Sequence, residues 1–249
     1  MNLNVYLSGE IHTDWRDQIV NGANGLAVAF TGPVTDHAAS DDCGVAILGA
    51  EESKYWHDHK GAMVNAIRTR KGIEDADVVV VGHTGSGRSS VVLGSTANHV
   101  IHHTERTVVV VRGERRELPE LIVVGADDHD LDDDGENESV RALRWAYGVE
   151  GARIILVAHA WFVPTFLAGR FSNPGADFEQ LDQEAIEIAE RVIAAAGEAP
   201  DGVDVRPTAL NGTPEFALIE ASREADLTVV GSRGRGGFTG LVLGSTSLD

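Results

Sequence analysis

The chain has 249 residues, 43% of them hydrophobic, which is enough to build one large domain or two small ones and excludes a wholly disordered protein. Its formal net charge of −19 argues against nucleic acid or an anionic membrane as a partner, because the field of the protein repels both. The single cysteine, Cys43, excludes an internal disulfide, and neither a signal peptide nor an apolar run of the ~20 residues that a membrane helix needs is recognisable. We therefore expect a cytoplasmic protein.

Acidic residues far outnumber basic ones, and most of the basic residues are arginines. Acidic side chains outnumber basic ones by 39 to 20, and the only lysines are Lys54, Lys60 and Lys71. Many carboxylates with few lysines are typical of proteins from a salt-rich cytoplasm, where counterions screen the mutual repulsion. A halophilic protein whose stability rises with salt is one hypothesis, and an ordinary acidic protein is the alternative.

Short apolar runs alternate with amphipathic helical stretches along the chain. The predicted strands are Leu3–Leu7, Leu26–Phe30, Val78–Val81, Val108–Val111, Leu121–Val124, Ile154–Val157, Leu227–Val230 and, with a weaker pattern, Val203–Val205. The clearest helix carries one apolar stripe, formed by Leu181, Ala185, Ile188, Ala189, Val192 and Ala196. This alternation predicts an α/β fold with mainly parallel sheets, whose ligands bind beyond the carboxyl ends of the strands.

One sequence pattern occurs twice. "ADVVVVGHTGSGRSSVVLGST" at 76–96 matches "ADLTVVGSRGRGGFTGLVLGST" at 225–246, and the first copy has one residue fewer between its glycines. A repeat at this distance predicts that each copy closes its own domain. We place the boundary in the charged stretch 112–120, which gives domains at 1–115 and 118–249.

The second copy has the spacing Gly231-x2-Gly234-x9-Gly244-Ser245. Without a Cβ atom, glycines let backbone N–H groups approach an anion closely. Gly244, Ser245 and Thr246 would open a helix, whose N-terminus suits phosphate, and Arg233 adds positive charge. The alternative is that the glycines form a tight loop and bind nothing.

Four segments upstream accompany this motif: "LIVVGAD", "DGENESVRALRWA", "ARIILVAHAW" and "LNGTPEFALIEAS". In this order they resemble the universal stress protein family, over about 76–113 and 118–249. The resemblance implies a stress-response protein that binds ATP or another adenine nucleotide, with or without Mg²⁺. It implies that adenine lies against Asp127 or, because of an insertion, Asp134. Further contacts are implied at Val157, Gly231, Arg233, Gly234, Gly244, Ser245 and Thr246.

The front of the chain carries a different resemblance. "NLNVYLSGEIHTDWRDQI", "FTGPVTDHAASDD" and "NAIRTRKGIEDADVVVV" resemble the YtoQ-like family, whose fold is similar to that of nucleoside 2-deoxyribosyltransferases, over about 1–81. The resemblance implies a nucleoside-processing enzyme that cleaves N-glycosidic bonds, with Glu10, Asp14 and Asp41 as candidate catalytic carboxylates. Two alternatives are that Asp14 only caps a helix beginning at Trp15, and that the chain is an inactive chimera, because the glycine repeat replaces the later half of the relatives' site.

Together these features predict two flavodoxin-like (Rossmann-like) three-layer α/β domains. Domain 1–115 is a mosaic with a YtoQ-like front and a universal stress protein-like end, and domain 118–249 is the nucleotide-binding one. After Gly94-Ser95-Thr96 the first copy continues into a further strand, whereas only three residues follow Thr246. We therefore expect the second sheet to lack its last strand, and copies of the chain to associate through the open sheet edge.

No metal site is predicted. Asp130, Asp132, Asp134 and Gly135 follow the order of a calcium-binding loop, but Arg141 stands where that loop has its bidentate glutamate. We interpret this stretch as a solvated acidic loop. The expected role of the protein is nucleotide binding rather than turnover, because no positioned nucleophile or general base accompanies the glycine loop.

Overall fold

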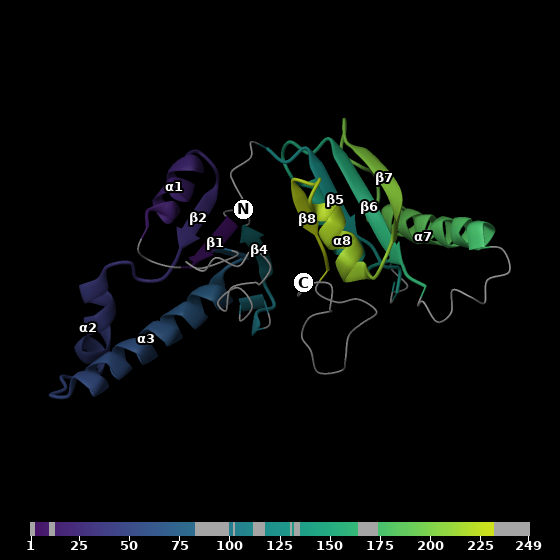
Figure 1. Ribbon diagram of the computed structural model, residues 1–249. Coiled ribbons are helices and arrows are strands. Elements are labelled where there is room, and N and C mark those ends of the chain that lie inside the picture. Colours follow the sequence, from purple (N-terminus) through teal and green to yellow (C-terminus); the bar gives the residue numbers. More distant parts are fainter. Residues whose placement is uncertain are drawn as a thin grey trace. The chain divides into compact units, whose positions relative to one another are not determined.

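A computed structural model describes residues 3–9, 13–82, 100–101, 103–111, 118–129, 131, 135–163 and 174–231, the side chains of 174–177 excepted. The chain divides into two compact units, Met1–Gly113 (unit 1) and Glu114–Asp249 (unit 2), which are described separately. Each unit contains a parallel sheet of four described strands with helices packed on it (Figure 1). None of the described helices combines the length and the apolar character that crossing a bilayer requires.

Unit 1 has β1 at the inside of its sheet, in the order β2-β1-β3-β4, with all neighbouring strands parallel. Its elements are β1 (Leu3–Ser8), α1 (Trp15–Gly22), β2 (Val28–Thr31), α2 (His37–Leu48), α3 (Lys54–Asp75), β3 (Val78–Gly82) and β4 (Thr107–Val111). Alternate residues of β3 are buried, as the period of two in a strand requires. The main buried cluster consists of Tyr6, Ala76, Val79, Val81 and Val100.

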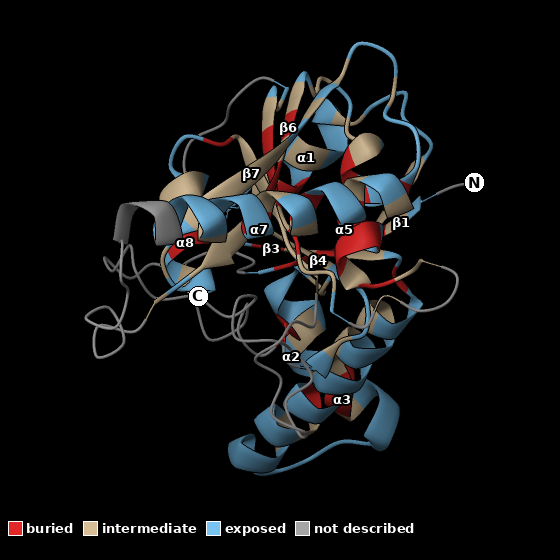
Figure 2. Ribbon diagram, turned by 90° about the vertical axis from the view of Figure 1, so that its right-hand side faces the viewer, coloured by how far each residue is buried: buried red, intermediate tan, exposed pale blue. Residues whose placement is uncertain are grey.

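The helices α2 and α3 form a hairpin that projects from this sheet (Figures 1 and 2). The two helices approach each other closely at glycines, because a Cβ atom at Gly44 would lie 2.2 Å from the backbone nitrogen of Gly61. Polar bonds join them beside this crossing, where Asn65 Nδ2 donates to Ser40 O at 3.0 Å. At its other end α3 reaches the sheet, and Gly72 lies against the ring of Tyr6.

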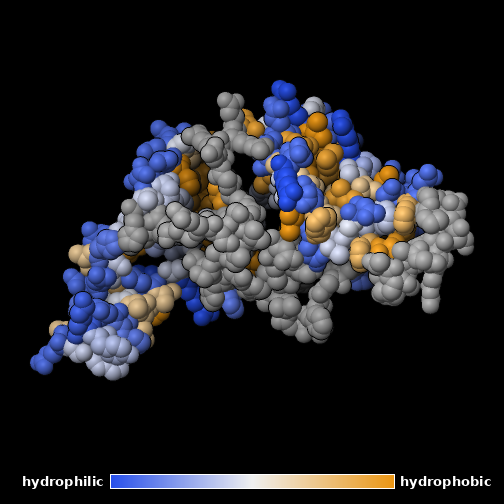
Figure 3. Space-filling model, viewed as in Figure 1, coloured by the Kyte–Doolittle hydropathy of each residue, from blue (hydrophilic) through white to orange (hydrophobic). Residues whose placement is uncertain are grey.

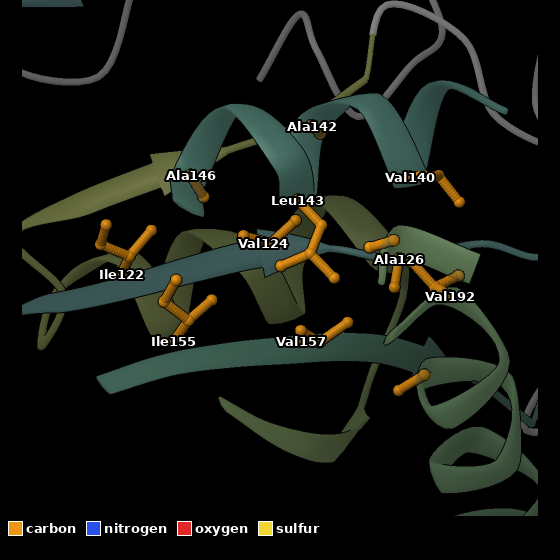
Figure 4. Close-up of a cluster of buried hydrophobic side chains, with 12 residues drawn as sticks. Ile122, Val124, Ala126, Val140, Ala142, Leu143, Ala146, Ile155, Val157 and Val192 are labelled. Carbon is orange, nitrogen blue, oxygen red and sulfur yellow. The ribbon is translucent and has the colours of Figure 1, made fainter. Parts of the chain in front are cut away.

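Unit 2 has the strand order β7-β6-β5-β8, again with parallel neighbours. Its elements are β5 (Leu121–Gly125), α5 (Glu138–Tyr147), β6 (Ile154–Trp161), α7 (Pro174–Ala196), β7 (Asp204–Asn211), α8 (Pro214–Ser222) and β8 (Leu227–Val229). The helices α5 and α7 cover one face of the sheet, and Figure 4 shows Leu143 of α5 and Val192 of α7 against Ile122, Val124 and Ile155. On the other face, Leu218 of α8 packs with Val123 and Ala158.

The two parallel sheets with helices on their faces confirm the predicted α/β class. All eight predicted strands occur, and three of them, β2, β6 and β7, differ from the prediction by two residues or more at one end. β2 begins at Val28 and not at Leu26, whose side chain is 63% exposed. The weakly patterned Val203–Val205 overlaps the start of the long strand β7, which begins at Asp204 and pairs with β6 over its whole length. The stripe predicted for α7 is also confirmed, since Ala185, Ala189, Val192 and Ala196 are buried.

Among the described strands, β7 and β8 form the edges of the second sheet. The expected loss of a last strand concerns 232–249, and these residues lie outside the described part of the chain. The open-edge association therefore stays a prediction.

Candidate nucleotide-binding site

Two of the predicted contact residues follow the carboxyl ends of β5 and β8, which are neighbouring strands of the second sheet. Val124 of β5 is in register with Val229 of β8, and the chain continues from these residues to Asp127 and Gly231 respectively. Neighbouring strands lie about 4.8 Å apart. Asp127 and Gly231 therefore emerge side by side, where open α/β sheets bind their ligands.

The start of α5 fixes the loop that carries Asp127. Asn137 caps α5, because its side-chain oxygen accepts from the backbone N–H of Val140 at 2.9 Å. Its amide nitrogen donates to the carbonyl oxygens of Asp127, at 2.7 Å, and His129, at 3.1 Å. The buried hydroxyl of Ser139 accepts from the backbone N–H of Asp127 at 2.8 Å. Both backbone groups of Asp127 are thus bound by side chains of one helix terminus.

The two neighbouring carboxylates of this loop have different partners. Asp128 forms an ion pair with Arg191 of α7, with 2.7 Å between Oδ2 and Nη2, and so ties the loop to that helix. Asp127 accepts from the backbone N–H of His129 at 2.9 Å and is half-buried at the strand end. A carboxylate has further acceptor capacity, which suits an amino group of a bound base.

Gly231 is the first glycine of the second repeat and lies against the first residue of α5. A Cβ atom placed on it would be 2.6 Å from the Cβ of Glu138 and 3.2 Å from its carbonyl carbon. Non-bonded atoms do not lie this close together. Any larger residue at position 231 would therefore force the chain or the start of α5 to move. The glycine-rich segment therefore begins directly beside the N-terminus of α5.

The neighbouring strand β6 adds groups that the sequence analysis did not single out. His159 Nδ1 lies 2.7 Å from the carbonyl oxygen of Ala126. Since a carbonyl only accepts, this nitrogen carries the proton, and Nε2 is an acceptor in the neutral ring. Trp161 donates from Nε1 to Asp182 at 2.6 Å, and its ring centre lies 5.7 Å from that of Phe178.

A cavity of about 280 Å³ lies between the end of β6 and α7, and it is lined by His159, Ala160, Trp161, Phe162, Leu181, Glu184, Ala185 and Ile188. For His159, Ala160 and Trp161 the available signal was the sequence "HAW" after the predicted strand. Leu181, Ala185 and Ile188 belong to the apolar stripe that was predicted for α7. The strand before "HAW" was predicted to end at Val157, but β6 continues to Trp161.

Val157, which was expected to contact the nucleotide, lies on β6 in register with Val124 of β5. Its side chain is fully buried among Val124, Leu143 and Val192 (Figure 4), and its strand is paired on both sides. A contact of Val157 with a nucleotide stays a prediction. The other expected contacts, Arg233, Gly234, Gly244, Ser245 and Thr246, and the alternative Asp134, lie outside the described residues.

In unit 1 the candidate catalytic carboxylates lie on different elements. Asp14 occupies the N-cap position of α1, but its side chain accepts from Gln18 at 3.0 Å and makes no capping bond to the backbone. Asp41 lies in the middle of α2 with an exposed side chain, and Glu10 is outside the described residues.

The side chain of Arg16, in α1 two residues after Asp14, is buried. Arg16 donates to the carbonyl oxygens of Leu7, at 3.1 Å, and Gly9, at 2.9 Å. It thereby fixes the loop that follows β1.

Across the described residues of both units, no group of three or more His, Cys, Asp or Glu side chains could hold a metal ion.

Comparisons with known proteins separate the two parts of the chain. Residues 119–249 match the family model described as Universal stress protein family, and residues 6–117 match the one described as Nucleoside 2-deoxyribosyltransferase YtoQ. A universal stress protein of Mycolicibacterium smegmatis is 34% identical over 183 residues, which cover 70% of this chain and 58% of that protein. The chain thus spans a little over half the length of this relative.

Two further comparisons concern the front part of the chain and the fold of the whole chain. The uncharacterized protein YtoQ of Bacillus subtilis is 35% identical over 82 residues, which are 32% of this chain and 55% of that protein. The crystal structure of a universal stress protein from Archaeoglobus fulgidus covers 99% of this chain and is itself covered to 91%, with a TM-score of 0.51 and 17% identity. At this identity the likeness concerns the fold alone.

Proposed function

The chain belongs to the universal stress protein family, and we propose that its unit 2 binds an adenine nucleotide, ATP in the first place, at the carboxyl edge of β5 and β8. The observation that carries the proposal is the position of Asp127 and Gly231, which follow the carboxyl ends of the neighbouring parallel strands β5 and β8. A fixed carboxylate and the start of a glycine-rich segment are the two kinds of group that a base with an exocyclic amino group and a phosphate chain need.

In this proposal the carboxylate of Asp127 accepts a hydrogen bond from the amino group of adenine. The bonds from Asn137 and Ser139 hold the Asp127 backbone before the ligand arrives, which lowers the cost of ordering the site. The phosphates lie on the glycine-rich segment that begins at Gly231, with or without Mg²⁺. The role is binding in a stress response, not turnover.

The two copies of the glycine motif provide a matched experiment. Gly231→Ala places a methyl group 2.6 Å from Glu138, whereas a Cβ atom at the corresponding Gly82 of the first copy meets nothing within 4 Å. We expect Gly231→Ala to weaken ATP binding, measured by titration calorimetry, and Gly82→Ala to leave it unchanged. Equal affinities in both variants, or no ATP binding by the unaltered chain, would contradict the proposal.

A second substitution tests the base contact. Asp127→Asn replaces one acceptor oxygen by a donor, so it should weaken ATP binding by about tenfold, the value of one good hydrogen bond. It should weaken GTP binding less, because guanine presents a carbonyl oxygen where adenine has its amino group. A parallel loss for both nucleotides would show that Asp127 does not face the base.

A second candidate function belongs to unit 1 and is favoured by the match of residues 6–117. It is cleavage of the N-glycosidic bond of a nucleoside, with Asp14 and Asp41 as the candidate carboxylates among the described residues. The test is incubation of the full chain with deoxynucleosides and chromatographic detection of free base, with Asp14→Asn as the comparison. Release of base that Asp14→Asn abolishes would support this candidate, and no release would exclude it for the substrates tested.

A further inference from the structure

Helix α3 exposes an apolar face along much of its length. The face toward α2 contains its buried residues, Gly61 and Val64. On the opposite side four large side chains remain exposed: Tyr55 by 66%, Trp56 by 52%, Met63 by 49% and Ile67 by 66%. Pale and light-orange groups accordingly lie among the blue ones on the α2–α3 hairpin in Figure 3. A grouped apolar surface of this kind is uncommon on a protein that acts alone.

The outward residues follow the spacing of a helix-pairing seam. Trp56, His59, Met63, Ala66 and Arg70 are separated alternately by three and four residues, which is the a/d pattern of two packed helices. Ala66 and the neighbouring Ala62 are small, so another helix can approach closely in the middle. With 22 residues α3 offers a seam of about 33 Å.

The two ends of this seam differ in chemistry. The N-terminal end is aromatic, since the ring of His59 is stacked on Tyr55 at 6.0 Å and lies edge-on to Trp56 at 5.6 Å. The C-terminal end is cationic at Arg70 and Lys71, which are bonded within the helix to Glu74 and Asp75 and stay largely exposed. A parallel pair of such helices would place cations against cations. An antiparallel pair places each cationic end over the aromatic end of its partner, where cation–π contacts form.

We propose that α3 pairs in antiparallel orientation with α3 of a second copy of this chain, around a two-fold axis at Met63. Trp56 and Arg70 are equally distant from Met63 along the helix, at seven residues on either side of it. A two-fold axis at Met63 therefore sets Trp56 against Arg70 of the other copy. The same surface patch serves both copies, as a two-fold dimer requires. One helix per copy gives an interface at the small end of the specific range, so the dimer is reversible.

Sedimentation velocity of the full chain over a concentration series tests the pairing. The unaltered chain should pass from monomer to dimer with rising concentration. Met63→Glu sets two carboxylates against each other at the axis and should weaken the dimer by about tenfold or more. Val20→Glu makes the same charge change on an exposed position of α1 and should leave association unchanged. A monomer throughout the series, or a dimer that Met63→Glu does not weaken, would overturn the proposal.

Cysteine cross-linking tests the orientation independently of affinity. In the antiparallel pair Met63→Cys faces its own counterpart and should form an intermolecular disulfide on mild oxidation. Trp56→Cys alone should not, but a mixture of Trp56→Cys and Arg70→Cys should give the mixed dimer. Native Cys43 is buried between α2 and α3 and serves as the background in every sample. Self-cross-linking of Trp56→Cys would indicate a parallel pair and contradict the proposal. Association that persists without either cross-link would assign it to another surface, such as a sheet edge.

Discussion

Helix α5 of unit 2 has 10 residues and buries five of them, whereas α3 of unit 1 has 22 residues and buries two. The difference lies in what each helix covers. α5 lies on its sheet and packs Val140, Leu143 and Ala146 against β5 and β6. Among the described residues, α3 packs mainly on α2, through glycines, and reaches its sheet near Gly72 and Ile73. A longer helix therefore contributes less apolar burial when its neighbour is another exposed helix and not a sheet.

Unit 2 and the α2–α3 hairpin of unit 1 also differ in how they position functional groups. The terminus of α5 is fixed by the core below it, and it in turn holds the Asp127 loop through Asn137 and Ser139. The hairpin of unit 1 offers an accessible apolar surface instead, which favours association over a preformed pocket. The comparison predicts that equal substitutions in α5 and in the hairpin have unequal effects on stability.

The largest effect is expected for Leu143→Ala. Leu143 has no exposed surface, and truncation of a buried leucine costs about 2–5 kcal/mol because a cavity remains. Leu48→Ala makes the same change at a side chain of α2 that is 52% exposed, and should cost less than about 0.5 kcal/mol. Urea denaturation gives both values, and hydrogen exchange assigns each loss to its unit. A similar cost for both variants would contradict the contrast between the units.

The glycine contact of the hairpin gives the next largest effect. Gly44→Ala places a methyl group 2.2 Å from backbone atoms of Lys60 and Gly61, and these cannot move away without separating the helices. We expect a loss of about 1–3 kcal/mol, visible as faster hydrogen exchange in α2 and α3. The control is Gly22→Ala in α1, where a Cβ atom meets nothing within 4 Å and alanine should be neutral or slightly stabilising. Unchanged exchange in Gly44→Ala would mean that the helices are less tightly apposed than described.

The N-cap residues of α2 and α5 allow the same type of capping hydrogen bond to be compared in the two units. Asp36 accepts from the backbone N–H of Ala39 at 2.7 Å and is exposed, so Asp36→Ala should cost about 1 kcal/mol. Asn137→Ala removes a buried cap and also the donor to the carbonyls of Asp127 and His129, so it should cost about 2 kcal/mol. It should also weaken ATP binding, whereas Asp36→Ala should not. Thermal melts and calorimetric titrations of both variants measure these differences, and equal costs would argue against a fixed Asp127 loop.

Much of the fold was predictable because buried strands leave a direct trace in the sequence. The runs around Val123 and Val79 are apolar and β-branched, and both became inner strands of the sheets. β7 was only weakly predicted because it lies at the edge of the described sheet and its residues are mostly half-buried, so its pattern is diluted. The projection of α2 and α3 was not predictable, since helical periodicity does not say which neighbour an apolar face meets.

The site was predicted unevenly for a related reason. Asp127 and Gly231 follow β5 and β8, whose ends were predicted to within one residue. Val157 was expected at the ligand from the family resemblance and stays a prediction, while His159 and Trp161 were missed because β6 was predicted too short. The bonds from Asn137 and Ser139 depend on the exact path of the loop after β5, which the sequence does not encode in a pattern. The stabilising effect of salt, the nucleotide and the open-edge association stay predictions.

The smallest expected effect has the opposite sign. The hydroxyl of Tyr147, in α5, is buried and has no hydrogen-bond partner among the described residues, and burial raises the pKa of this phenol. In the unfolded chain water bonds to the hydroxyl, so folding carries a desolvation cost that phenylalanine of the same shape avoids. Tyr147→Phe should therefore stabilise the protein by up to about 1 kcal/mol at neutral pH.

The pH dependence follows from the direction of the shift. Because the folded phenol loses its proton less readily than the unfolded one, rising pH favours unfolding from the ordinary tyrosine value of 10.0 upward. The advantage of Tyr147→Phe should thus grow above that pH. Tyr55→Phe, at a side chain that is 66% exposed, is the control and should leave the stability at neutral pH unchanged. If Tyr147→Phe is destabilising by chemical denaturation at neutral pH, the hydroxyl has a partner in solution, and the packing of α5 against its sheet is less dry than its burial indicates.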